Sequence, residues 1–290
     1  MKVSASMVEH NIVEEKALFE IAPGLKRLQE RLWTTENMGS VSYPTAAHAR
    51  IASLETSSFW FRHRNRVIGT LINKYPPEGP LLDVGGGNGS VSLALRRYGL
   101  STIVLEPGMD ASSIAHARGL TVIRATFNAE MFVEGSVSAI GIFDVIEHID
   151  DDLQFLRDVR KVMSRGGLLY VTVPALMSLW SSDDQFAGHY RRYSRHSLRQ
   201  TLLSAGFEIV ALSGFFSLLV PLVFLFRTLP SAFGSRKVED VDKALDHHRS
   251  EQGTGALMER ILSFELPIIA RGHAFPFGTS LVAVARKSTN

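Results

Sequence analysis

Residues 81–90, with the sequence Leu-Leu-Asp-Val-Gly-Gly-Gly-Asn-Gly-Ser, decide how the rest of this chain is interpreted. A short apolar run ends in an acid and a glycine-rich turn, and a helix is expected to begin at about Gly89-Ser90. Glycine permits a positive φ and lets a ligand approach the main chain closely, while a helix start points free N–H groups at the turn. The stretch therefore predicts a site for a nucleotide-like cofactor, and the simplest alternative is a glycine turn that holds no ligand.

The spacing of the glycines indicates which cofactor is expected. They fall as Gly85-x-Gly87-x-Gly89, with Asp83 two residues ahead, and Gly86 and Asn88 complete the turn. A carboxylate at that point repels a pyrophosphate but suits a ligand that carries an ammonium group. The pattern resembles the first motif of class I S-adenosylmethionine-dependent methyltransferases, and this resemblance implies S-adenosyl-L-methionine as cofactor.

Composition limits the class of protein. The chain has 290 residues, a formal net charge of +2, 45% hydrophobic residues and no cysteine. Balanced charge argues against nucleic acid as a partner, and the lack of cysteine excludes disulfides and thiolate chemistry. The first twenty residues lack the apolar core of a signal peptide, so a cytoplasmic location is expected.

The chain divides into a region before the predicted core, the core itself and a region after it. Residues 1–79 are expected to be a helical cover, because apolar residues between Glu14 and Leu32 recur at three- and four-residue steps. In this cover, Trp60 is expected to lie over the cofactor, and Arg62 or Arg64 near its carboxylate; the alternative is a helix packed on the sheet with solvated arginines. Residues 80–213 alternate strands and helices, which predicts a parallel sheet covered on both faces.

Two loops of this core carry further candidates for cofactor contacts. Glu106-Pro107 follows the second strand, about twenty residues after the glycine turn, where such folds place an acid that accepts the ribose hydroxyls. After the third strand, Thr126 occupies the position at which many methyltransferases have an acid for the adenine amino group, and Phe127 can stack on that ring.

The fourth strand ends in Phe143-Asp144-Val145-Ile146-Glu147-His148, which resembles the fourth motif of the same superfamily. With the glycine turn and Glu106 at matching spacing, the chain is identified as a member of the class I S-adenosylmethionine-dependent methyltransferases. That resemblance implies an α/β Rossmann-like fold with a seven-stranded, mostly parallel sheet and an antiparallel last strand. It also implies Asp144 as a cofactor contact.

The C-terminal third resembles a bacterial subgroup with the signature Gly-His-Tyr-Arg-Arg-Tyr, present here as residues 188–193. We expect strand six at 207–212, a hydrophobic helical insertion at 214–272, and the last strand within 273–290. Four residues of this third are predicted to bind the acceptor: Tyr190, Arg192, Tyr193 and Phe215. For Arg192, as for Arg191, the alternative is an ion pair with Asp183 or Asp184.

A hydrophobic stretch interrupts this region, because residues 209–226 contain no charge. Its first residues belong to strand six, and the remainder, 215–226, is too short to span a membrane and contains Pro221. Three interpretations remain open: a helix buried over the active site, a lid for an apolar substrate, or an anchor in a membrane interface.

Methyl transfer from a sulfonium requires a nucleophile held in line and, where needed, a base. His148 and His189 are the candidate bases, with Glu147 beside the first of them, because imidazole titrates near neutral pH. Asp144, Glu147 and His148 could also ligate a hard cation, but a structural role for these side chains is favoured and no metal is predicted.

The predicted function is methyl transfer to a small, apolar or lipid-like acceptor, at oxygen first and then at carbon or nitrogen. The main alternative is a non-catalytic, cofactor-binding or membrane-associated accessory protein with the same fold. An NAD-dependent oxidoreductase is a second alternative, which Asp83 and the Glu147-His148 pair disfavour.

Overall fold

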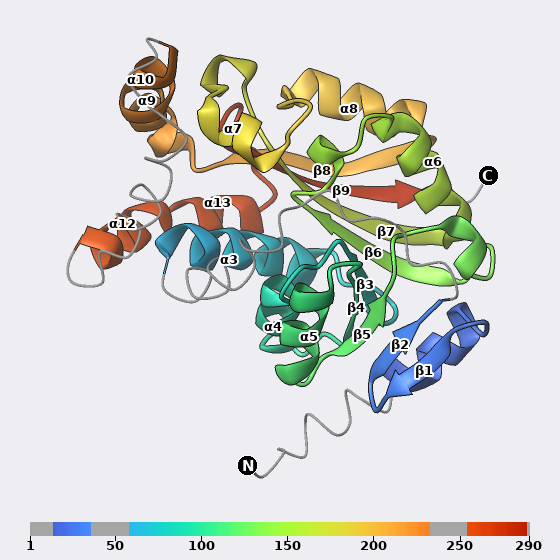
Figure 1. Ribbon diagram of the computed structural model, residues 1–290. Coiled ribbons are helices and arrows are strands. Elements are labelled where there is room, and N and C mark those ends of the chain that lie inside the picture. Colours follow the sequence, from blue (N-terminus) through green and yellow to red (C-terminus); the bar gives the residue numbers. More distant parts are fainter. Residues whose placement is uncertain (1–13, 36–57, 233–253, 289–290) are drawn as a thin grey trace.

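One nine-stranded sheet organises the computed structural model, which describes residues 14–35, 58–232 and 254–288 (Figure 1). The strand order is β1-β2-β5-β4-β3-β6-β7-β9-β8. The six strands from β2 to β7 in this order are parallel, whereas β9 runs antiparallel to β7 and β8, and β1 antiparallel to β2. The strands are β1 Lys26–Gln29, β2 Leu32–Thr34, β3 Leu81–Val84, β4 Thr102–Leu105, β5 Thr121–Arg124, β6 Val137–Phe143, β7 Met163–Pro174, β8 Phe207–Phe215 and β9 Ser280–Lys287.

Among the seven strands from β5 to β8, the last strand of the chain, β9, runs antiparallel to both neighbours and the others share one direction, so the expected fold class is confirmed. Strands β3, β4 and β6 begin and end at the predicted residues. These central strands are almost entirely buried, because helices cover both faces of the sheet. Near-continuous apolar runs of this kind are typical of parallel sheets, and they make the strands easy to find in the sequence.

The N-terminal region is not the purely helical cover that the sequence predicts. Residues 14–21 are helical, but a hairpin follows, in which β1 and β2 are joined through Arg31 at φ 61°. Strand β2 pairs in parallel with β5, so the hairpin extends the sheet from seven strands to nine. The cover resumes with helix α3, Phe59–Lys74, while residues 1–13 and 36–57 lie outside the described residues.

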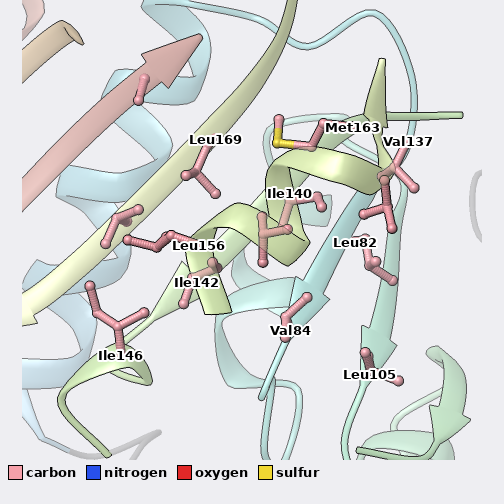
Figure 2. Close-up of a cluster of buried hydrophobic side chains, with 14 of the residues drawn as sticks. Leu82, Val84, Leu105, Val137, Ile140, Ile142, Ile146, Leu156, Met163 and Leu169 are labelled. Carbon is pink, nitrogen blue, oxygen red and sulfur yellow. The ribbon is translucent and has the colours of Figure 1, made fainter. Parts of the chain in front are cut away.

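Two layers of helices enclose the sheet (Figure 1). The helix at 14–21, α6 and α8 pack on one face, where Leu156 meets Ile140 and Ile142 in the cluster of Figure 2. Helices α3, α4, α12 and α13 pack on the other face, and α5 covers β4 and β5. The bounds of these helices are α4 Ser90–Arg96, α5 Met109–Ala117, α6 Asp152–Val162, α7 Ser182–Ala187, α8 Arg195–Ser204, α12 Thr254–Leu262 and α13 Glu265–Ala270.

The hydrophobic segment divides into a buried root and an exposed end. Phe215 and Phe216 are fully buried, but Leu222, Leu225 and Phe226 are 42%, 52% and 73% exposed. The segment forms the short turns and helices η4 Ser217–Leu219, α9 Val220–Val223, η5 Phe224–Thr228 and α10 Leu229–Ala232. The first of the three interpretations, a helix buried over the site, is therefore wrong for Leu222 and for residues 224–226. None of the helices in the described residues combines the length and apolar character needed to cross a membrane.

The buried root is held by a carboxylate from α13. Glu265 accepts hydrogen bonds from the N–H groups of Phe216 (2.9 Å) and Ser217 (2.7 Å), and Phe216 turns the chain with a φ of 57°. His63 of α3 lies 2.9 Å from the same carboxylate, and both side chains are fully buried. A buried group of hydrogen bonds around the Glu265 side chain thus fixes the point where β8 ends and the exposed segment begins.

Candidate active site

The glycine turn joins β3 to α4 and opens onto space beside the main chain. Gly85, Gly87 and Gly89 have φ values of 68°, 53° and 73°, a region that residues with a side chain rarely adopt. A Cβ on Gly87 would have no neighbour within 4 Å, whereas one on Gly85 would lie 2.7 Å from Val145. A ligand can therefore approach the backbone at Gly87, while Gly85 is required by packing.

Asp83 supports the turn from within the protein. The Ser92 hydroxyl donates to its Oδ2 at 2.6 Å, and a Cβ on Gly86 would lie 2.9 Å from its carboxyl carbon. Burial raises the pKa of Asp83 from 3.8 to about 6, with Arg64 acting in the opposite direction. Its Oδ1 is buried and has no hydrogen-bond partner among the described residues. One oxygen thus remains to accept a hydrogen bond from a cationic ligand.

Glu106 lies at the end of β4 against the same turn, as the spacing predicts. Its Oε2 accepts the N–H of Gly87 at 2.9 Å, and its Oε1 accepts the N–H of Gly108 at 2.7 Å. The side chain is nearly buried, and Pro107 beside it is half-buried. A carboxylate is therefore placed next to the open position at Gly87, where the ribose hydroxyls were predicted to bind.

Helix α3 brings an arginine to this site, and that residue is Arg64. Its Nη1 donates to Asp144 Oδ2 at 2.6 Å, and the hydroxyl of Thr172 donates to Asp144 Oδ1 at 3.1 Å. Asp144 ends β6 with a φ of 58°, which an aspartate tolerates better than most residues. Arg64 also acts electrostatically on Asp83, so its charge lies near two carboxylates at the carboxyl ends of β3 and β6.

Arg62 and Trp60, the two cofactor contacts predicted on α3, have other partners. Arg62 lies on a different face of the helix and binds Glu259 of α12 at 2.6 Å. The Trp60 indole stacks on Phe216, with ring centroids 3.9 Å apart. Both side chains thus join α3 to the C-terminal part of the chain. Of the two arginines, Arg64 is the one that lies toward the glycine turn.

The remaining predicted cofactor contacts differ in accessibility. Thr126 is exposed after β5, and Phe127 packs its ring against Phe132 and the edge of Phe155. The Asn88 side chain is buried in the turn, and the main-chain carbonyl of Asn88 accepts from Arg118 Nη1 at 2.7 Å. The structure therefore gives Phe127 a role in the core, and its predicted stacking on adenine stays a prediction.

Three potential catalytic groups come together beyond Asp144. Glu147 and His148 lie in the short turn η2, Ile146–His148, and His189 lies in the loop after α7. One ligating atom from each of the three lies within 4.8 Å of the other two. The two imidazole rings meet edge to face, 4.7 Å between centroids. Residues forty positions apart in the sequence thus form one cluster at the carboxyl edge of the sheet.

Burial changes the acidity of this cluster. It raises the pKa of Glu147 well above its usual value, and the nearby Asp144 carboxylate adds to the effect. Burial, and then the neighbouring His189, lowers the pKa of His148 to about 4. His148 is accordingly a neutral imidazole near pH 7, and Glu147 is 1% exposed.

Asp184 orients the cluster; the sequence offered it as a possible partner of Arg192, but its contact with His189 was not predicted. It accepts from Ser181 N at 2.9 Å at the start of α7, and its Oδ1 lies 2.9 Å from His189 Nδ1. Arg192 Nε donates to the same oxygen at 2.8 Å. The signal was present in the sequence as the capping pattern Ser-x-x-Asp five residues before His189.

The four predicted acceptor-binding residues separate into one exposed and three buried side chains. Tyr190 is 58% exposed beside the cluster. Arg192 is 7% exposed and bound to Asp184, and the buried Tyr193 donates its hydroxyl to Asp152. Phe215 lies in the core. The prediction that Arg192, Tyr193 and Phe215 contact the acceptor is therefore wrong. Their side chains are buried and support the site from within the protein.

A cavity of about 180 Å³ lies at the opposite edge of the sheet, beside the amino ends of β3 and β6. Pro80, Ser136 and Glu20 are among its lining residues, and none of the site residues above contributes to it. It has no part in the arrangement described here.

Comparison with known proteins places the chain in a family. A family model described as a methyltransferase domain matches residues 60–212, which is more than half of the chain. The chain belongs to this family. The predicted enzyme class and the predicted cofactor, S-adenosylmethionine, are thereby confirmed at the level of the family, while the narrower subgroup carried by residues 188–193 stays a prediction.

Individual relatives agree with that assignment. A probable S-adenosylmethionine-dependent methyltransferase of Mycobacterium tuberculosis is 28% identical over 178 residues, covering 57% of this chain and 62% of the relative. A C-methyltransferase of Streptomyces niveus is 25% identical over 173 residues, covering 56% of this chain and 41% of the relative. The chain thus spans less than two thirds of the length of these relatives.

A solved structure gives the same fold. It is a methyltransferase of Thermotoga maritima, described as a possible histamine N-methyltransferase, with a TM-score of 0.53 and 16% identity. The match covers 84% of this chain and 97% of that one. At this identity the likeness shows the fold alone.

Proposed function

We propose that this protein transfers the methyl group of S-adenosylmethionine to a small, apolar or lipid-like acceptor, at oxygen first. The observation that carries the proposal is that two groups of residues lie along one edge of the sheet, which they divide into two halves. One half is the glycine turn with Asp83 and Glu106, and the other is the cluster of Glu147, His148 and His189. Donor and acceptor groups thus have adjacent places at the carboxyl ends of β3 and β6, where open α/β sheets bind ligands.

The residues at the turn fit S-adenosylmethionine by charge and space. The open position at Gly87 admits the nucleoside, Glu106 lies beside it, and the unpartnered Oδ1 of Asp83 suits the ammonium group. Arg64 supplies a cation for the carboxylate end of the same ligand. The bound sulfonium provides an activated methyl group, so the protein has to hold the acceptor in line.

The cluster beyond Asp144 is assigned to the acceptor. The imidazole of His148 or His189 can receive the proton that a hydroxyl or amine acceptor loses, and Tyr190 is exposed beside them. Methylation at carbon is the second choice, which the relative from Streptomyces niveus supports by its name.

The exposed apolar segment supports the class of acceptor. Leu218, Leu222, Phe224, Leu225, Phe226 and Leu229 are between 39% and 73% exposed. The segment reaches the acceptor side of the molecule, because Ser231 Oγ accepts the N–H of Ser182 in α7 at 2.9 Å. Contiguous exposed apolar side chains mark a binding surface more often than chance, and we assign this one to an apolar acceptor and to peripheral contact with the lipid that contains it.

Calorimetric titration with S-adenosylhomocysteine tests the proposal, with NAD titrated in parallel. Binding of the homocysteine compound and not of NAD supports it, and methyl transfer to hydroxylated apolar compounds is then measured with labelled donor. Binding of NAD, or of neither compound, would contradict the assignment of the glycine turn. Cofactor binding without transfer to any tested acceptor would favour an accessory role.

A further inference from the structure

The groups that point into the acceptor half of the site form a potential metal centre. In the sequence, Asp144 is the candidate third ligand beside Glu147 and His148. A structural role is favoured for those three side chains, and no metal is predicted from them. The structure pairs Asp144 with Arg64 and Thr172 and supplies His189 in its place. The resulting set contains two imidazoles and one carboxylate, which is a common ligand set for first-row transition metals and for catalytic zinc.

The histidines are oriented as metal-binding histidines usually are. The Nδ1 of His189 faces the Asp184 carboxylate at 2.9 Å, which leaves Nε2 on the other side of the ring. Asp184 is itself fixed by Ser181 and Arg192. The His148 ring is hydrogen-bonded to the backbone of residues 187 and 188. Carboxylate and backbone partners of this kind fix the tautomer and the direction of a ligand histidine.

Glu147 gives an independent indication of a missing positive partner. Its side chain is 1% exposed, and its Oε2 is buried without a hydrogen bond from any described residue. A carboxylate oxygen buried in this way is costly unless a cation or a donor satisfies it. Because Glu147 belongs to the same group of three, a cation bound there would satisfy this oxygen as well.

We propose that Glu147, His148 and His189 bind one divalent transition-metal ion, with Zn²⁺ the best suited of those that accept two imidazoles and a carboxylate. The ligand atoms must draw together by roughly 1 Å to reach bonds of about 2.0–2.2 Å. Mg²⁺ and Ca²⁺ prefer all-oxygen sites and are disfavoured. The role of the ion rests on the proposed function, in which it would replace the histidine bases: it holds the oxygen of a hydroxyl-bearing acceptor beside the methyl group and makes that hydroxyl more acidic, so that its proton leaves to solvent.

Untagged protein, stripped with chelator and dialysed, is titrated with ZnCl₂ by calorimetry and with CoCl₂ by visible absorption, with MgCl₂ as a control. We expect one zinc ion per chain and a cobalt spectrum with d–d bands. His189→Gln and Glu147→Gln should each weaken zinc binding by at least roughly 10-fold, the lower limit for loss of even an outer-shell partner. His196→Gln, an exposed histidine on α8, is the matched control and should bind zinc as the wild type does.

Titration of each protein with S-adenosylhomocysteine separates this inference from the proposed function. A variant that still binds the homocysteine compound is folded, so unchanged zinc affinity in such a His189→Gln protein overturns the metal site. Absence of zinc binding in wild-type protein that binds S-adenosylhomocysteine overturns it as well. Zinc binding that depends on His189 in a protein that does not bind S-adenosylhomocysteine supports the metal site and overturns the proposed function.

Discussion

Three carboxylates at the edge of the sheet illustrate how neighbouring residues of one type take different roles. Asp83 is buried under the glycine turn, Glu106 accepts two backbone N–H groups, and Asp144 binds Arg64. Their positions could be predicted from the sequence, because Asp83 lies near the end of a buried strand and Glu106 and Asp144 each follow one directly. Their partners could not, because Arg64 and Thr172 reach Asp144 from elements far apart in the chain.

Replacing Glu106 by alanine is expected to weaken S-adenosylhomocysteine binding by about 1–3 kcal/mol, because a charge-assisted hydrogen bond is lost. Thermal stability should also fall, since Gly87 and Gly108 lose the acceptor of their N–H groups. Calorimetry and thermal unfolding measure the two effects. Glu106→Gln retains one acceptor oxygen and should show smaller changes, and unchanged affinity in the alanine variant would remove Glu106 from the site.

Asp83 should give the protein a pH-dependent loss of stability. Its pKa is raised from 3.8 to about 6 in the folded protein, where Ser92, Arg64 and Glu106 face it. Between these values the folded state binds more protons than the unfolded state, so this contribution to stability falls as the pH rises. A shift of about 2 units corresponds to about 3 kcal/mol.

The variant Asp83→Asn removes this dependence while keeping the size of the side chain. The free energy of unfolding of the variant minus that of wild type is expected to be about 2–3 kcal/mol larger at about pH 7.5 than at about pH 4. Urea unfolding at both pH values measures the difference. An equal difference between variant and wild type at the two pH values would show that the Asp83 carboxyl is not perturbed.

At the scale of elements, regular strands were predictable and the N-terminal hairpin was not. Strands such as β3 and β6 are continuous apolar runs between turn residues. In the hairpin, Leu28 and Leu32 continue a helical spacing from Leu18, yet Leu28 is 50% exposed on β1 and Leu32 is buried on β2. The deciding interaction is the pairing of β2 with β5, ninety residues away, and local spacing carries no information about it.

The candidate site shows the same limit. The glycine turn, Glu106 and the Glu147-His148 pair could be located because each follows a strand at a typical spacing. The approach of His189 depends on α7 and its Asp184 cap, and the burial of Tyr193 and Phe215 depends on tertiary packing. Aromatic residues near a site are equally compatible with substrate contact and with the core until that packing is known.

The exposed segment is expected to mediate contact with lipid. Leu225→Ser/Phe226→Ser should lower partition onto phosphatidylcholine–phosphatidylglycerol vesicles by about tenfold or more, since burying one such side chain contributes about 1.5–3 kcal/mol. Co-sedimentation with vesicles measures partition. Leu28→Ser replaces an equally exposed leucine at the other end of the sheet and should have no effect. Equal partition of the double variant and the wild type would refute contact through this segment.

At the scale of the whole molecule, the N-terminal segment is an integral part of the fold. Glu14 is fully buried, binds Arg96 of α4 at 2.8 Å, and accepts the N–H of Thr102 at 2.9 Å. Helix 14–21 also contributes Leu18 and Ile21 to the larger core. The helix at 14–21 is thereby attached to α4 through Arg96 and to β4 through Thr102.

Glu14→Ala is accordingly expected to destabilise the protein by about 3 kcal/mol, because it leaves the Arg96 charge buried without its partner. Chemical unfolding measures the loss. Glu20→Ala, an exposed position on the same helix, is the matched control and should leave stability unchanged. A Glu14→Ala protein as stable as the control would show that this segment is not required by the core.

Helix α3 carries His63 and Arg64 as adjacent residues with different destinations. His63 reaches Glu265, which fixes the start of the exposed segment, and Arg64 reaches Asp144 at the proposed donor site. Any displacement of α3 when the donor enters is therefore transmitted to the segment that receives the acceptor. By thermodynamic reciprocity the acceptor must then alter donor affinity by the same factor. We expect each substrate to change the affinity for the other, which titration of S-adenosylhomocysteine in the presence and absence of an acceptor would measure.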